Sequence, residues 1–175
     1  FFGYPKIRED EKDIHIPSGK LTAFLYYIFM KKILSRDEVA GMFWAESTEE
    51  NAKISLRNAL HKIRKTFKSD IILSPNKSML VLNEVIRIDI DVKKFEQDPY
   101  KNLDLYAEDF LKGFYIKDAI EFDYWCTELN SFYRESFIKN SEKKIKDMFE
   151  NKNKNIESLI SKLLSIDNFN ETAYT

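Results

Sequence analysis

The chain has 175 residues, which at roughly 100–200 residues per domain allows one domain or two small ones. Hydrophobic residues make up 43% of the sequence and aromatic residues 14%, which excludes a globally disordered chain. Only 4 Gly and 4 Pro are present, so a fold of many short strands is disfavoured and a mainly α fold with a small β component is predicted. With one cysteine, Cys126, and 2 His, neither an internal disulfide nor a Cys/His zinc site is expected, and we expect a reducing, cytoplasmic setting.

The net charge of −1 hides an asymmetry between the two halves of the chain. Residues 1–83 carry 14 Lys and Arg against 10 Asp and Glu, whereas residues 84–175 carry 14 against 19. Within the first half, residues 51–67 hold five Lys or Arg and no acid. That density predicts a polyanionic partner. The longest apolar run, Leu21 to Met30, is half the length of a membrane span, and no membrane association is expected.

The N-terminal third predicts two short strands followed by helices. The strands are expected at Phe1 to Tyr4 and at Asp13 to Pro17. Ser18 is a plausible N-cap for a core helix from Lys20 to about Lys32. Ser35 is expected to cap the next, short helix.

A basic helix and a hairpin follow. Ser47 and Glu50 have the spacing of a capping box, which predicts that they open a helix over residues 49–67. Ile71 to Leu73 and Met79 to Leu82 predict a hairpin with an exposed tip, and Ile86 to Ile90 alternates like a further strand.

After Asp91 the pattern is helical. A long helix is predicted from Ala119 to about Phe149, a break at residues 152–155 and a further helix at Ile156 to Ile166. The apolar stripe of the long helix is Phe122, Trp125, Leu129 and Phe132. Trp125 is expected to be buried against an upstream helix that carries Leu103, Tyr106 and Phe110.

The basic helix separates into two faces on a helical wheel. The predicted core face contains Ala52, Leu56, Ala59, Leu60, Ile63 and Phe67. The opposite face holds Ile54, Arg57, Asn58, His61 and Lys65, with Lys53 and Arg64 on one flank and Lys62 on the other. Because like charges four residues apart destabilise a helix, an acid-free basic face favours a binding role over an unused basic surface.

These residue types suit a DNA groove. Arg bonds guanine bidentately, Asn bonds adenine, Ile meets a thymine methyl and Lys meets phosphates. Arg36, together with exposed N–H groups at the start of its helix, is a candidate to hold a phosphate, and Asn76, Lys77 and Ser78 at the hairpin tip are weaker candidates. The predicted DNA-binding residues are Arg36, Lys53, Ile54, Arg57, Asn58, His61, Lys62, Arg64, Lys65 and Lys77.

Several stretches resemble a known family. FGYPKI, the helix before LSRDEVAGMFW, NAKISLRNALHKIRK and IDIDVKKFE are similar to the OmpR/PhoB-type winged-helix domain of the antibiotic-regulatory-protein (SARP) group of bacterial activators. LYAEDFLKGF, EFDYW and LLSIDNFNE resemble the bacterial transcriptional activator domain (BTAD) that follows it. The resemblance implies a winged helix-turn-helix DNA-binding domain over residues 1–97 and an incomplete helical domain, similar to tetratricopeptide repeats, over residues 98–175.

The expected function is therefore sequence-specific binding of double-stranded DNA by a transcriptional activator. The acidic helical domain is expected to mediate homo-oligomer formation on DNA, receive a signal or contact RNA polymerase; by resemblance the turn from Trp44 to Thr48 is a second polymerase candidate. No catalytic motif, metal-ligand spacing or Gly-rich phosphate loop is present, so no enzymatic activity and no cofactor are expected. The alternatives are a protein-interaction scaffold that uses the helical array and the basic helix, and an RNA-binding helical repeat protein.

Overall fold

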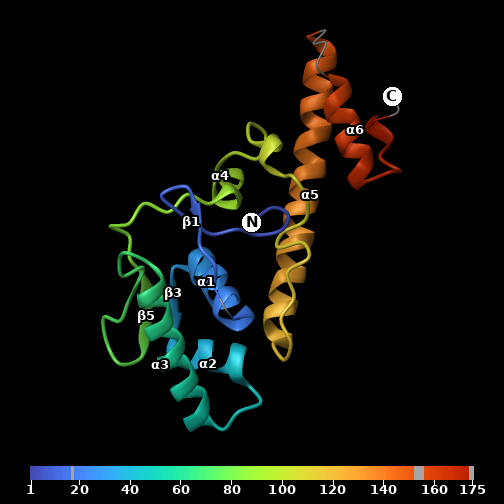
Figure 1. The fold of residues 1–175 in the computed structure, drawn as a ribbon. Helices are drawn as coiled ribbons and strands as arrows, with labels where there is room; N and C mark the ends of the chain where they lie inside the picture. The colour runs from blue at the N-terminus through green and yellow to red at the C-terminus, as the bar shows by residue number, and fades with distance from the viewer. Residues whose placement is uncertain (17, 152–155, 174–175) are drawn as a thin grey trace. The chain divides into compact units, whose positions relative to one another are not determined.

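The computed structural model describes residues 1–16, 18–151 and 156–173 and is mainly helical with a small β component, as predicted (Figure 1). Its elements in chain order are β1 (Arg8–Glu9), β2 (Lys12–Asp13), α1 (Gly19–Lys31), β3 (Ile33–Ser35), α2 (Arg36–Trp44), α3 (Glu49–Thr66), β4 (Ile72–Leu73), β5 (Met79–Leu82), α4 (Asp91–Gln97), the 3₁₀ turn η1 (Leu103–Leu105), α5 (Ile120–Glu150), α6 (Ile156–Ile166) and the 3₁₀ turn η2 (Glu171–Ala173).

The chain forms two compact units, and each unit contains segments that are far apart in sequence. Unit 1 contains residues 1–4, 90–112 and 126–175, and unit 2 contains residues 5–89 and 113–125. This grouping differs from the predicted division at residue 97, because residues 1–4 and α4 pack with the helical part of the chain. Residues 113–125 pack with residues 5–89.

Unit 2 contains a three-stranded antiparallel sheet in the order β3-β5-β4 (Figure 1). Leu34 of β3 pairs with Leu80 of β5, and Ile72 of β4 pairs with Leu82. All four of these side chains are buried, so one face of the sheet contributes to the core. The hairpin was predicted, but β3 was not. It begins directly after Lys32, whose positive φ of 67° ends α1 and redirects the chain.

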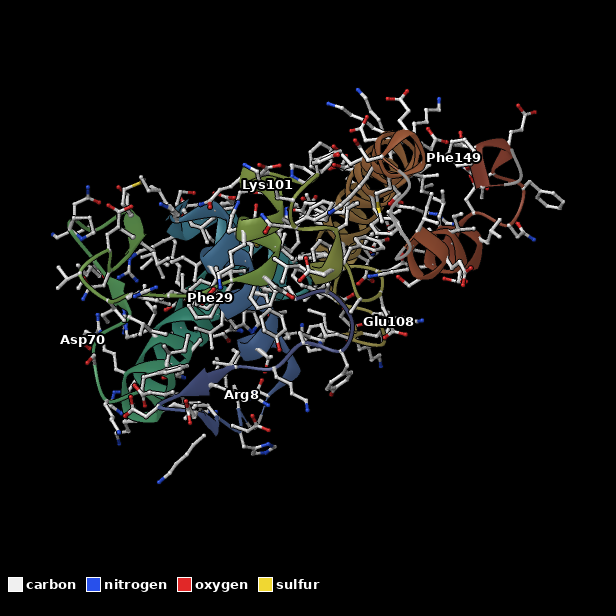
Figure 2. All side chains as sticks on the ribbon, turned by 90° about the horizontal axis from the view of Figure 1, so that it is seen from above. Arg8, Phe29, Asp70, Lys101, Glu108 and Phe149 are labelled. Carbon is white, nitrogen blue, oxygen red and sulfur yellow. The ribbon has the colours of Figure 1, made fainter. Side chains whose placement is uncertain are left out.

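The helices of unit 2 begin at local caps. Ser35 is the N-cap of α2 as expected, and it also forms a capping box with Glu38, in which the side chain of each residue accepts from the backbone N–H of the other. The cap of α3 was predicted one residue too early. The Thr48 hydroxyl, rather than that of Ser47, accepts from the N–H of Asn51 at 3.4 Å. Phe29 of α1 lies in the interior of this unit (Figure 2).

Residues 113–125 complete the core of unit 2. Phe122 packs on Phe43 of α2 with ring centroids 5.6 Å apart, and Trp125 packs edge-on against Tyr27 of α1 at 4.9 Å. The predicted burial of Trp125 is confirmed, since its exposed fraction is 9%. The α-helix expected around Tyr106 does not form at residues 98–119, and Trp125 belongs to unit 2 together with Tyr27 and Phe122.

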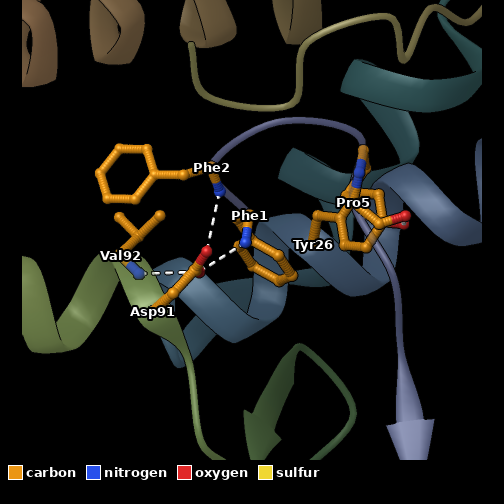
Figure 3. Close-up of polar contacts among 6 residues, drawn as sticks. All are labelled: Phe1, Phe2, Pro5, Tyr26, Asp91 and Val92. Carbon is orange, nitrogen blue, oxygen red and sulfur yellow. Dashed lines mark hydrogen bonds and ion pairs between the residues drawn. The ribbon is translucent and has the colours of Figure 1, made fainter. Parts of the chain in front are cut away.

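Unit 1 has an aromatic core of its own. Phe2 contacts the rings of Phe95, Tyr106 and Tyr133 at centroid distances of 4.9–5.4 Å. Asp91 at the start of α4 accepts hydrogen bonds from the nitrogens of Phe1 (2.5 Å), Phe2 (2.9 Å) and Val92 (2.8 Å), which fixes the N-terminal segment in this unit (Figure 3).

Three predicted elements are wrong. Residues 1–4 do not form a strand, and Phe2 makes only an isolated bridge to Phe110. Asn83 turns the chain by accepting from Val85 and Ile86, and no strand is present at residues 86–90. Residues 98–119 contain the short turn η1 rather than a helix.

The remaining predictions have mixed outcomes. The first short hairpin lies at β1 and β2, and β2 shares only Asp13 with the strand predicted from Asp13 to Pro17. Residues 14–16 form no strand, and Pro17 lies outside the described residues. The predicted break at residues 152–155 is also outside the described residues. On α5, Phe132 is 57% exposed and the neighbouring Tyr133 takes the predicted core position.

Candidate nucleic-acid interface

Helix α3 has the predicted amphipathic character. The six residues of the predicted core face are all buried, with exposed fractions of 9% or less; they are Ala52, Leu56, Ala59, Leu60, Ile63 and Phe67. The cap at Thr48 sets the rotation of the helix, and the apolar residues at helical spacing hold it against the rest of unit 2. This packing leaves the opposite face in solvent.

The solvent face carries the predicted polar and basic residues. Ile54 is 44% exposed, which is a large exposure for an isoleucine in a helix. The exposed polar side chains on this face and its flanks are Lys53, Arg57, Asn58, His61, Lys62, Arg64 and Lys65. The structure thus brings eight of the ten predicted site residues onto one helix, and we call their surface the α3 face.

Two of the predicted basic residues have carboxylate partners that the sequence analysis did not assign. Lys53 forms an ion pair with Glu49 at 2.5 Å, four residues earlier, and Arg64 Nε lies 3.8 Å from Asp70. The Lys53–Glu49 hydrogen bond raises the pKa of Lys53 and lowers that of Glu49. Asp70 lies at the surface beyond the end of α3 (Figure 2). The expectation that no acid neutralises this helix is therefore wrong for these two cations.

The other cations of the α3 face have no such partner. Within residues 1–16, 18–151 and 156–173, no carboxylate forms an ion pair with Arg57, Lys62 or Lys65. The acids of α3 are confined to its first turn, at Glu49 and Glu50. The positive charge that remains uncompensated therefore lies along the middle and the C-terminal half of the helix.

The hairpin loop between β4 and β5, residues 74–78, presents Lys77 to solvent. Asn76 is not available in the same way, because its Oδ1 accepts hydrogen bonds from the N–H groups of Ser78 and Met79 at 2.9 Å. It also accepts from the Ser78 hydroxyl at 3.0 Å. Asn76 and Ser78 thus fix the shape of the loop, and Lys77 is the member of the predicted tip with a free side chain among the described residues.

Arg36 was predicted to hold a phosphate together with the N–H groups at the start of α2. Two of those N–H groups already have acceptors: Arg36 N–H donates to the Ser78 carbonyl at 2.8 Å, and Glu38 N–H donates to the Ser35 hydroxyl at 3.0 Å. The Arg36 side chain is half-buried, and its Nη2 donates to the Ser74 hydroxyl at 2.9 Å. These groups at the start of α2 are therefore engaged within the protein and do not form an open anion site.

The i,i+4 spacing of Glu49 and Lys53 is a sequence signal that predicts their ion pair. No local pattern reveals the other two pairings. The contact of Arg36 with Ser74 depends on tertiary placement, and that of Arg64 with Asp70 depends on the path of the chain beyond the end of α3.

Other kinds of site were also considered. Among the described residues no group of three or more His, Cys, Asp or Glu is placed to hold a metal ion. No helix in the described part of the chain is both long and apolar enough to cross a membrane. Cys126 lies on α5 and is half-buried.

No protein-family model and no curated protein sequence matches the chain.

Proposed function

We propose that the protein is a sequence-specific, double-stranded DNA-binding transcription regulator in which α3 enters the major groove. The observation that carries the proposal is the row of cations on α3 that lack carboxylate partners, Arg57, Lys62 and Lys65, beside two cations that have them. Helix surfaces ordinarily mix charges of both signs, because like charges four residues apart cost stability. A uniformly basic face is stabilised when a polyanion supplies the missing negative charge.

The order of elements in unit 2 supports the same proposal. A short helix α2, a four-residue turn, the basic helix α3 and the hairpin β4–β5 follow one another, which is the order of a winged helix-turn-helix. In that arrangement the second helix contacts base edges and the hairpin approaches the adjacent backbone or groove.

Each exposed residue type on the α3 face has a partner in duplex DNA. Arg57 and Asn58 are assigned to base edges, guanine and adenine respectively, and Ile54 to a thymine methyl group. Lys62 and Lys65 are assigned to phosphates, and His61 lies among them. Lys77 is assigned to a backbone phosphate beyond the hairpin.

The helical part of the chain has a different proposed role. Residues 84–175 carry 14 Lys and Arg against 19 Asp and Glu, so phosphate repels this part of the chain. We assign to it homo-oligomer formation on DNA, signal input or contact with RNA polymerase, as the resemblance to SARP-type bacterial activators implies. We propose that the protein acts in the cytoplasm and has no enzymatic activity.

The competing proposal is a protein-interaction scaffold in which the α3 face binds an acidic protein. The two are separated by fluorescence anisotropy with a labelled random-sequence 20-bp duplex and the full 175-residue chain. We expect a Kd of roughly 10⁻⁴–10⁻⁶ M at physiological salt. We also expect poly-glutamate of equal charge to compete poorly. Failure to bind duplex, with retention of poly-glutamate, would favour the scaffold.

Sequence specificity is tested by selecting preferred duplexes from a random pool. Asn58→Ala should relax the preference at one or two base pairs and cost roughly 1–3 kcal/mol at the selected site. Lys62→Ala is the matched control on the same helix and should weaken all sequences alike. A base-specific loss from Lys62→Ala and a uniform loss from Asn58→Ala would reverse the assignment of these two residues.

A further inference from the structure

Arg36 is a predicted DNA-binding residue whose side chain is engaged with the hairpin loop of unit 2. Its Nη2 donates to the Ser74 hydroxyl at the start of the hairpin loop, and its backbone N–H donates to the carbonyl of Ser78 at the end of the same loop. One residue at the start of α2 therefore holds both ends of residues 74–78. Ser35, the residue before it, pairs with Met79 in the β3–β5 ladder, which places the start of α2 beside the hairpin.

The side chain is poorly disposed to contact DNA itself. Arg36 is half-buried, and its Nε is inaccessible to solvent and has no hydrogen-bond partner among the described residues. To present the guanidinium fork to a phosphate, the side chain would have to leave Ser74. A planar guanidinium that already donates to one side of a loop is well suited to fixing that loop.

The loop has few other connections to the rest of unit 2. The hydrogen bonds of Asn76 to Ser78 and Met79 are local, and they shape the tip without attaching it to α2. Lys77, between them, is exposed and has no ion-pair partner in the described part of the chain. The position of the Lys77 ammonium group relative to α3 therefore depends on how firmly the two ends of the loop are held.

We propose that Arg36 is a positioning residue for the DNA-binding surface: it holds the hairpin loop through Ser74 and Ser78 so that Lys77 is presented to a phosphate together with the α3 face. This inference rests on the proposed function. A loop that is already ordered binds with a smaller loss of conformational entropy, so the hold of Arg36 on the loop strengthens the contact that Lys77 makes.

The test compares Ser74→Ala, Arg36→Lys, Lys77→Ala and the double variant Ser74→Ala/Lys77→Ala in the full chain, with a random-sequence duplex at about 0.15 M salt. Lys77→Ala should weaken binding about fivefold, as expected for one phosphate contact with a log–log salt slope of about −0.9. Ser74→Ala removes no charge, yet it should weaken binding about two- to fivefold, and Arg36→Lys, which keeps the charge, should behave in the same way. In the Lys77→Ala background, Ser74→Ala should add less than about twofold, because the contact through which it acts is already lost.

The opposite pattern would show that Arg36 contacts phosphate directly. In that case Ser74→Ala leaves binding unchanged and Arg36→Lys retains most of the affinity. Arg36→Ala then flattens the salt slope by about 0.9 even without Lys77. That result overturns the positioning role.

Amide hydrogen exchange of Ser78 and Met79 without DNA separates this inference from the proposed function. Ser74→Ala should accelerate both amides relative to the unsubstituted chain while amides in the buried strand centre, such as Leu80, stay protected. Unchanged exchange at Ser78 and Met79 overturns the inference even if duplex binds. Faster exchange in a chain that binds no duplex supports the hold on the loop and refutes the proposed function.

Discussion

The two units of the molecule use their charged groups differently. In unit 1 several charged groups serve internal contacts: the Tyr133 hydroxyl donates to Glu96 at 2.5 Å, the Tyr106 hydroxyl donates to Asp109 at 2.8 Å, and Lys162 donates to the Leu103 carbonyl at 3.4 Å. In unit 2 the exposed half of α3 keeps three cations without any carboxylate partner among the described residues.

This difference separates charge that supports a fold from charge that is available to a partner. The polar groups of unit 1 are needed where aromatic residues with polar tips are buried, since an unpaired buried hydroxyl is costly. Arg57, Lys62 and Lys65 form no ion pair among the described residues, and the core face of the same helix is fully apolar. We interpret the α3 face as the part of the molecule that is specialised for a polyanion.

The largest predicted effect tests whether residues 113–125 belong to unit 2. Trp125→Ala should lower the free energy of unfolding by about 3–5 kcal/mol, because it leaves a cavity against Tyr27 and Phe122. Tyr124→Ala, at the adjacent and 69% exposed position, is the control and should change stability by less than about 0.5 kcal/mol. Urea denaturation measures both, and equal losses would contradict the packing of this segment.

The same contacts predict that residues 1–97 make a poor isolated domain. That fragment lacks Phe122 and Trp125 and would expose the rings of Phe43 and Tyr27. A chemical-denaturation midpoint for the fragment equal to that of unit 2 in the full chain would argue against this interpretation.

The next effect concerns the buried tyrosines of unit 1. Burial, and then the hydrogen bond to Glu96, raise the pKa of Tyr133 far above its ordinary value near 10. The folded state therefore holds this proton more tightly than the unfolded chain does. The resulting stability is complete below about pH 10 and is lost progressively as the pH rises above it.

Tyr133→Phe should cost about 1 kcal/mol at pH 8, because it removes the hydrogen bond to Glu96, whose other oxygen still accepts from Lys93 at 2.8 Å. It should also reduce the loss of stability between pH 9.5 and 11. Tyr115→Phe, at a site that is 74% exposed, serves as the control. Urea midpoints across this pH range test the prediction, and a Tyr133→Phe chain as alkali-sensitive as the control would contradict it.

The smallest effect compares one acid from each unit. Glu49→Gln frees Lys53 on the α3 face and should strengthen binding to a random duplex by about two- to fivefold at 0.15 M salt. Glu135→Gln on α5 changes the net charge by the same amount at an exposed position. Anisotropy titrations should find a change of less than about twofold for Glu135→Gln, whereas equal gains would mean that only the net charge matters.

Local features of the fold could be predicted from the sequence better than tertiary ones. The N-cap at Ser35 and the two faces of α3 follow from patterns within a few residues, and both are confirmed. Residues 1–4 belong to unit 1 and residues 113–125 to unit 2 because of contacts between distant segments, such as Phe122 with Phe43. No local periodicity reveals such contacts.

The errors at the candidate site have related causes. The wheel of α3 placed Lys53 and Arg64 correctly on its flanks but ignored their carboxylate neighbours beyond the basic segment, Glu49 and Asp70. Arg36 was assigned from its position at a helix start, whereas its actual partner, Ser74, lies 38 residues away in sequence.

The central claim is that the unpaired cations of α3 bind duplex DNA, and the salt dependence of binding tests it most directly. On a random duplex, where no preferred guanine is in place, Arg57 also meets phosphate, so Arg57, Lys62, Lys65 and Lys77 together predict a log–log slope of about −3.6 for the full chain. Replacing Arg57, Lys62 and Lys65 with Gln should reduce the slope to about −0.9. Replacing three exposed cations of α5, Lys139, Lys143 and Lys146, with Gln makes the same change in net charge and should leave the slope within about 0.5 of the unsubstituted value. Equal slopes for the two triple variants, or no measurable duplex binding by the unsubstituted chain, would contradict the account.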